Sequence, residues 1–186
     1  MDSLTATCVA CRANRDEIVA PGGALYDDGL WRLEHTFEPI PMVGWLVLKP
    51  IRHVESLADL TAEETAALGP LLRRITQAMT ETLAPARVYA ALFAEAVAHL
   101  HIHLIPRAAD LPEERRGPDV FALLSAAGHS GQNQGDPDEA RRVALAIKAR
   151  LAPAPEAAAG YAPTVVQVPA QMTAPEPAAA TVTSQP

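Results

Sequence analysis

Aromatic side chains and cysteine are scarce in this sequence of 186 residues, and basic residues are outnumbered by acidic ones. Only 4% of the residues are aromatic although 49% are hydrophobic, so we expect a core built from Val, Leu and Ile. Fifteen Lys and Arg face 22 Asp and Glu, a net charge of -7. This balance argues against binding of a nucleic-acid polymer, which depends on a basic surface. A small phosphorylated ligand is still compatible with it, because a pocket can be locally positive on an acidic protein.

Long hydrophobic runs are also missing. The most apolar stretches, such as residues 43–48, are far too short to cross a bilayer. The N-terminus has neither the basic start nor the apolar segment of a secretion signal. The two cysteines, Cys8 and Cys11, do not suggest the disulfide framework of a secreted scaffold. We therefore expect a cytoplasmic protein with no membrane partner.

Composition divides the chain near residue 151. From residue 152 onward Ala and Pro dominate, and only Glu156 and Glu176 are charged. Recurrent proline blocks helix and sheet, and nothing large is available to bury. We predict one folded domain over residues 1–151 and a disordered tail over residues 152–186 that carries no chemistry.

Short strands and two well-marked helices are predicted within the domain. The Asp28-Gly29 step favours a hairpin turn, and residues 61–64 have the form of a capping box that starts a helix. A last helix is capped by Asp136. The predicted strands cover residues 25–26, 30–33, 44–48, 88–93 and 99–105, and the predicted helices cover 61–83, 118–127 and 136–151. Adjacent strands with one main helix between them indicate an antiparallel sheet and an α+β fold.

Residues 99–107, HLHIHLIPR, are the most informative segment. His99, His101 and His103 alternate with aliphatic residues, so on a strand the three imidazoles share one face. Same-face neighbours lie roughly 6.6 Å apart, which separates His99 from His103 by about 13 Å. A zinc ion binds nitrogen at about 2.0–2.1 Å, so one ion cannot take all three, and we expect the histidines to differ in role. The alternative is an exposed histidine-rich strand without a function.

The pattern of three alternating histidines followed by two apolar residues, Pro and Arg resembles the signature of the histidine triad (HIT) superfamily. Residues 44–53, GWLVLKPIRH, are similar to the family's glycine, apolar strand and histidine-terminated segment. The resemblance implies a zinc-containing, homodimeric hydrolase of nucleotides such as diadenosine polyphosphates. It makes His101 the nucleophile, which attacks phosphorus to form a nucleotidyl-imidazole that water cleaves. His103 and Arg107 are assigned to the substrate.

Family members with an N-terminal Cys-x-x-Cys pair complete a zinc site with two histidines. By this resemblance the ligands are Cys8, Cys11, His53 and His99. Two thiolates and two imidazoles suit a closed structural site, in which the metal stabilises the fold and cannot activate water. Without a metal, the cysteines are two reduced thiols near the N-terminus.

Three departures from the family pattern affect the expected activity. Glu95 and Ala96 stand where many members have a Gln-Ser or Gln-Thr pair that donates hydrogen bonds to phosphate. Phe93 and Ala94 stand near the position where an Asn-x-Gly is common in the family. Trp45 stands where the family usually has a histidine after the glycine. Losing a charge-assisted hydrogen bond to phosphate costs about 1.5–3 kcal/mol. A nucleotide-binding module with weak catalysis is therefore an alternative, as is a nucleotidyltransferase or phosphorylase on the same fold.

Overall fold

The computed structural model describes residues 3–152, so the predicted tail, apart from Ala152, lies outside the described residues. The helices are α1 Ser3–Thr7, α2 Val9–Asn14, α3 Ala62–Leu83, α4 Phe121–Ser130 and α5 Pro137–Leu151, and the strands are β1 Tyr26–Asp27, β2 Trp31–His35, β3 Leu46–Pro50, β4 Arg87–Ala91 and β5 Ile102–Arg107. None of the described helices is long and apolar enough to cross a membrane.

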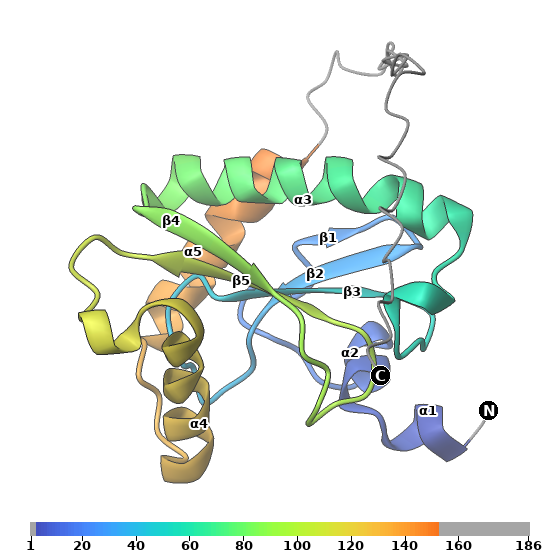
Figure 1. The fold of residues 1–186 in the computed structure, drawn as a ribbon, viewed down its shortest axis with the longest axis horizontal. Helices are drawn as coiled ribbons and strands as arrows, with labels where there is room; N and C mark the ends of the chain where they lie inside the picture. Colours follow the sequence, from blue (N-terminus) through green and yellow to red (C-terminus); the bar gives the residue numbers. More distant parts are fainter. Residues whose placement is uncertain (1–2, 153–186) are drawn as a thin grey trace, which may run out of the picture. The chain divides into compact units, whose positions relative to one another are not determined.

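The five strands form one antiparallel sheet in the order β1-β2-β3-β5-β4. The turn between β1 and β2 contains Gly29 at φ 83°, as the Asp-Gly step predicts. The chain leaves β3, runs through α3 and returns as β4 at the sheet edge, so that β5 pairs between β3 and β4 (Figure 1). The α+β prediction is confirmed.

Two helices cover one face of this sheet. Buried residues of α3, including Ile75 and Met79, and of α5, including Val143 and Ile147, join Leu46, Leu48 and Leu104 in the main core. The Thr61 hydroxyl accepts from Glu64 N–H while the Glu64 carboxylate accepts from Thr61 N–H, so α3 begins with the predicted capping box. On the opposite face, α4 contributes Leu123 to a smaller cluster with Trp45 and Ile105.

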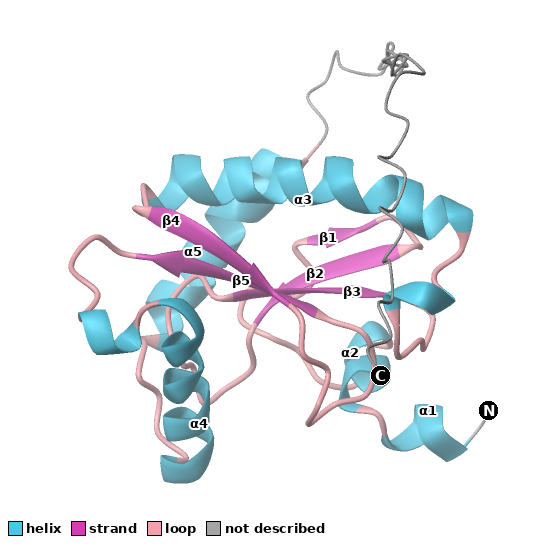
Figure 2. Ribbon diagram, viewed as in Figure 1, coloured by secondary structure: helices cyan, strands magenta, loops and turns pink. Residues whose placement is uncertain are grey.

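The histidine segment is extended, but its first half is not part of a strand. We predicted a strand from His99, whereas β5 begins at Ile102 and continues to Arg107, and the segment before it is drawn as loop (Figure 2). The register pairs Leu48 with Ile102, and its continuation would place Lys49 opposite His101 and Pro50 opposite Leu100. Proline has no N–H to donate to a ladder. The chain therefore leaves the sheet there, and Leu100 N–H bonds to Val54 O instead, at 2.7 Å.

The fourth strand and fourth helix also differ from the prediction at their ends. β4 covers residues 87–91 and not 88–93. Helix α4 continues through Gly128, which we expected to end it, and stops at Gly131 with φ 64°. A left-handed residue is the usual helix terminator, and a glycine inside a helix is only mildly unfavourable.

Candidate functional site

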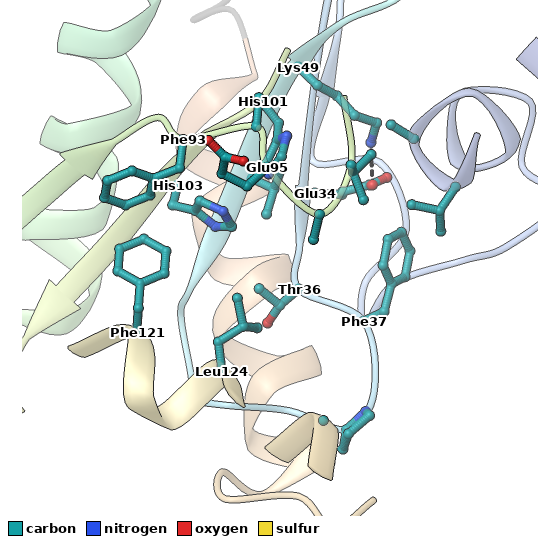
Figure 3. Close-up of a pocket in the computed structure, with 18 of the residues that line it drawn as sticks. Glu34, Thr36, Phe37, Lys49, Phe93, Glu95, His101, His103, Phe121 and Leu124 are labelled. Atoms are coloured by element: carbon teal, nitrogen blue, oxygen red, sulfur yellow. Dashed lines mark hydrogen bonds and ion pairs between the residues drawn. The ribbon is translucent and has the colours of Figure 1, made fainter. Parts of the chain in front are cut away.

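A cavity of about 440 Å³ opens on the sheet face opposite α3 and contains two of the three alternating histidines. His101 is half-buried at its wall, and the buried His103 lies beside it with ring centroids 4.8 Å apart (Figure 3). The further lining residues that matter here are Val9, Ala10, Glu34, Thr36, Phe37, Val47, Lys49, Phe93, Glu95, Ala96, Phe121 and Leu124.

Each triad imidazole has one ring nitrogen fixed by a neighbour. His101 Nδ1 donates to His99 O at 2.8 Å, which leaves the lone pair on Nε2. His103 Nδ1 accepts from Trp45 Nε1 at 3.0 Å, so its proton is on Nε2. His99 Nε2 donates to Pro50 O at 3.0 Å, which leaves its lone pair on Nδ1. The two cavity histidines thus present one nucleophilic nitrogen and one N–H donor.

Burial keeps two of these rings neutral. It lowers the pKa of His103 to about 4, with a smaller contribution from His101. It also lowers the pKa of His99 to about 4, helped by the positive charge of neighbouring groups such as His53 and Lys49. A neutral His103 donates from Nε2, and a neutral His99 can ligate a metal through Nδ1.

The structure brings the four predicted metal ligands together. One donor atom from each of Cys8, Cys11, His53 and His99 lies within 4.8 Å of the other three. Cys11 Sγ is 3.2 Å from His53 Nδ1 and 3.4 Å from His99 Nδ1, and Cys8 Sγ is 3.7 Å from His99 Nδ1. Sulfur and nitrogen ligands of a tetrahedral zinc ion lie about 3.6 Å apart. The cluster is therefore close to the size that zinc requires.

The surroundings of this cluster also fit a metal. The Pro50 carbonyl orients His99, and Glu55 Oε1 lies 3.6 Å from His53 Nε2, the kind of outer partner that metal-bound histidines have. Burial, and then the neighbouring Cys8, raise the pKa of the Cys11 thiol to about 11. This thiol therefore needs a compensating cation in order to ionise.

Sequence reasoning missed a buried group of charges in the same cavity. Lys49 on β3 bonds to Glu34 on β2, and both side chains line the cavity. Arg32 Nε lies 3.5 Å from the other carboxylate oxygen, Glu34 Oε2. Burial lowers the pKa of Lys49, although Glu34 opposes this effect. The sequence does place a charged residue, Glu34 or Lys49, among the apolar residues of each of these two strands. Which residue of the neighbouring strand each one meets depends on the register.

The other end of the cavity is aromatic. Phe121 lies 5.0 Å from Phe93, 5.1 Å from His103 and 5.3 Å from Trp45, measured between ring centroids. Glu95 and Ala96, which replace the family's phosphate-binding pair, line the cavity as well. The loop between β4 and β5 thus brings a carboxylate and a methyl group to the site.

The remaining cations and histidines lie elsewhere. Arg107, which we assigned to the substrate, is at the far end of β5 from His101 and does not line the cavity, and its assignment stays a prediction. Arg52 pairs with Glu64 at 2.8 Å. His35 is buried between Thr36 O and Gly44 N–H, which gives it a structural role.

Comparison with known proteins assigns the chain that forms this site to a family. The model of the HIT domain matches residues 18–110, half of the chain, which includes the cavity histidines. The chain belongs to the HIT family. A search of curated proteins gave no match.

Solved structures share the fold. A Zn-bound histidine triad family protein from Mycobacterium smegmatis is 23% identical, with a TM-score of 0.57 over 79% of this chain and 96% of that one. A Hit-like protein involved in cell-cycle regulation from Bartonella henselae is 20% identical, with a TM-score of 0.55 over 78% and 97%. A hypothetical histidine triad nucleotide-binding protein from Sulfolobus tokodaii is 14% identical, with a TM-score of 0.57 over 77% and 91%.

Proposed function

We propose that this protein hydrolyses a phosphoanhydride or phosphoramidate bond of a nucleotide through a nucleotidyl-His101 intermediate. The observation that carries the proposal is the pair of opposite tautomers at the cavity. His101 Nδ1 is committed to a backbone carbonyl and His103 Nδ1 to an indole N–H. The remaining nitrogens are a nucleophile and a donor on adjacent rings, which is what displacement at phosphorus requires.

In this reaction His101 Nε2 forms a bond to phosphorus, and the bond from phosphorus to the leaving group breaks with its electron pair on the leaving group. The His101 ring becomes cationic, and the His99 carbonyl oxygen that accepts from Nδ1 stabilises the charge. His103 Nε2–H donates to a phosphoryl oxygen. Water then attacks phosphorus and releases a proton to solvent, which balances the proton that the leaving group takes up from solvent, and cleavage of the P–N bond restores the lone pair of His101.

Replacement of the nucleophile tests this proposal. We expect His101→Ala to abolish turnover of a diadenosine polyphosphate or an adenosine phosphoramidate while the protein stays folded, because no other described nitrogen occupies that position. His129→Ala, on the exposed part of α4, is the matched control and should retain full activity. Hydrolysis by the His101 variant at the parent rate would contradict the mechanism.

We further propose that Cys8, Cys11, His53 and His99 hold a structural zinc ion. When bound, the ion would cross-link helix α2 to the segments that flank β3 and β5, and with four protein ligands it would have no open position for water. The donor set, the S–N spacing and the orientation of His99 by Pro50 support this assignment.

A nucleotide-binding module with weak catalysis is the second candidate, because Glu95 and Ala96 line the cavity where donors to phosphate are common in the family. The carboxylate of Glu95 repels an anionic substrate, and Ala96 offers no hydroxyl. Mass spectrometry of protein quenched during turnover separates the two functions. A nucleotidyl adduct on His101 supports the hydrolase, and nucleotide binding without any adduct supports the module.

The proposed partners are a nucleotide and a second copy of this chain. The dimer proposal involves α3 and the strands next to it. Helix α3 leads directly into β4, which is an edge strand with half-exposed and exposed residues, and unpaired strand edges favour association. Analytical ultracentrifugation tests this proposal, and a monomer at micromolar concentration would contradict it.

A further inference from the structure

The two ends of the cavity differ in chemistry. In Figure 3, Phe93 and Phe121 lie at one end, Lys49, Glu34 and Phe37 lie toward the other, and His101 lies between them. A phosphorus atom at His101 therefore has one substituent in an aromatic environment and the other beside a buried ion pair. The proposed mechanism uses His101 and His103 and leaves the ion pair without a role.

The polar groups at this end are incompletely satisfied. Lys49 has three N–H donors, and among the described residues its acceptor is Glu34 Oε1. Glu34 Oε2 accepts no hydrogen bond from the described residues but forms an ion pair with Arg32 Nε at 3.5 Å, and this buried nitrogen has no hydrogen-bond partner among those residues. Beside the cavity, Lys49 thus keeps donors that have no acceptor among the described residues, and Glu34 Oε2 keeps the capacity to accept a hydrogen bond next to its ion-pair partner.

A purely structural role does not explain why charges are kept here. A buried ion pair costs desolvation energy that its own attraction often fails to offset, and replacing such a pair by apolar side chains of similar volume is often neutral or stabilising. The cavity walls also include apolar and aromatic residues, with Val9 and Ala10 from α2, Val47 from β3 and Phe37. Such walls suit a flat, apolar ring face, and a polar floor suits the edge of the same ring.

We propose that Glu34 and Lys49 read the base of the bound nucleotide and favour guanine. This inference rests on the proposed nucleotide function and names its substrate class. The base lies between the apolar walls with its Watson–Crick edge on the pair. Guanine offers neighbouring N–H donors at N1 and N2 to a carboxylate and an acceptor at O6 to an ammonium, so it matches both groups. Adenine offers one donor and one acceptor on this edge, and unsubstituted purine offers no donor.

Binding of nucleoside monophosphates to the full chain, measured by titration calorimetry, tests the proposal. We expect GMP to bind more tightly than purine riboside 5′-monophosphate by roughly 10- to 100-fold, the effect of one or two hydrogen bonds to charged groups, with AMP between them. A 2′-deoxy GMP should keep this preference. If it bound as weakly as the purine analogue, the pair would read the ribose and the proposal would be overturned.

The matched variants are Glu34→Leu/Lys49→Met in the cavity and Glu139→Leu/Arg142→Met, which removes an exposed ion pair on α5. The first should reduce the preference for GMP over the purine analogue to less than about threefold while the analogue binds unchanged, and the second should retain the parent's preference. Should the cavity variant fail to fold, the binding of GMP, AMP and the purine analogue to the parent protein still tests the proposal. Equal binding of all monophosphates would overturn base reading only, whereas no binding of any would also remove the proposed function.

Discussion

Trp45 has a specific effect on His103 that an aromatic filler would not have. Its indole N–H donates to His103 Nδ1, and the ring also contacts Phe121 edge-on. In the Trp45→Phe variant the ring contact is largely kept but the donor is lost, so His103 can place its proton on either nitrogen. We expect kcat to fall roughly tenfold or more, and stability to fall by about 1–3 kcal/mol, the cost of an unsatisfied buried acceptor.

Nitrogen NMR of the labelled protein measures the His103 tautomer directly and distinguishes this role from simple packing. The Nε2–H form should dominate in the parent and mix with the Nδ1–H form in Trp45→Phe. Loss of stability with an unchanged tautomer would show that Trp45 only packs.

The residues of the proposed site could be singled out from their types and spacing, but their contact partners could not. Alternation along residues 99–103 separated the roles of the histidines, and the resemblance supplied Cys8 and His53 as further ligands. Trp45, which directly precedes β3, contacts His103 on β5, and Glu34 on β2 contacts Lys49 on β3. Such contacts depend on sheet register, which local sequence does not reveal.

Gly44 lets the chain enter β3 at a crowded point of the fold. Its φ is 80°, and a Cβ there would lie 2.6 Å from Leu83 Cδ1 and 3.2 Å from Pro106 Cγ. Gly23 has φ 68° with no atom within 4 Å of such a Cβ. Both Gly→Ala substitutions force alanine into the left-handed region, at about 1–2 kcal/mol. Gly44→Ala should cost a further 1–3 kcal/mol or so from overpacking.

Urea unfolding of the two variants measures this difference, with Gly23→Ala as the control for backbone conformation alone. Equal losses in the two variants would mean that the neighbours of Gly44 move aside freely.

Elements with strong local signals were predicted well, and those whose ends depend on a neighbouring strand were not. The capping box at Thr61 and the Asp136 cap mark α3 and α5 correctly because the signal lies within one turn. The predicted start of β5 was wrong because the pairing of β5 with β3 ends close to Pro50, a residue about 50 positions away. The period-2 pattern continues through His99 and His101, but the pattern reports extended backbone and not hydrogen-bonded pairing.

At the scale of the whole domain, the four proposed metal ligands come from three separate parts of the chain. Cys8 and Cys11 lie at the start of α2, His53 follows β3, and His99 precedes β5. His99 is also the residue whose carbonyl accepts from His101. A metal at this cluster would therefore fix both the N-terminal helix and the backbone that orients the proposed nucleophile, and it would link the stability of the domain to the geometry of the proposed active site.

Removal of the metal should for this reason lower stability and activity together. We expect the purified protein to contain about one zinc per chain by elemental analysis, and chelation to lower the melting temperature by several degrees or more, because metal binding adds to folding free energy. Hydrogen exchange should increase mainly over residues 8–14 and 99–101. Cys11→Ser should abolish zinc binding and reproduce these changes, whereas His129→Ala, outside the cluster, should bind zinc as the parent does. An unchanged melting temperature and exchange pattern after complete chelation would show that the four side chains assemble without a metal, and that α2 is held by packing alone.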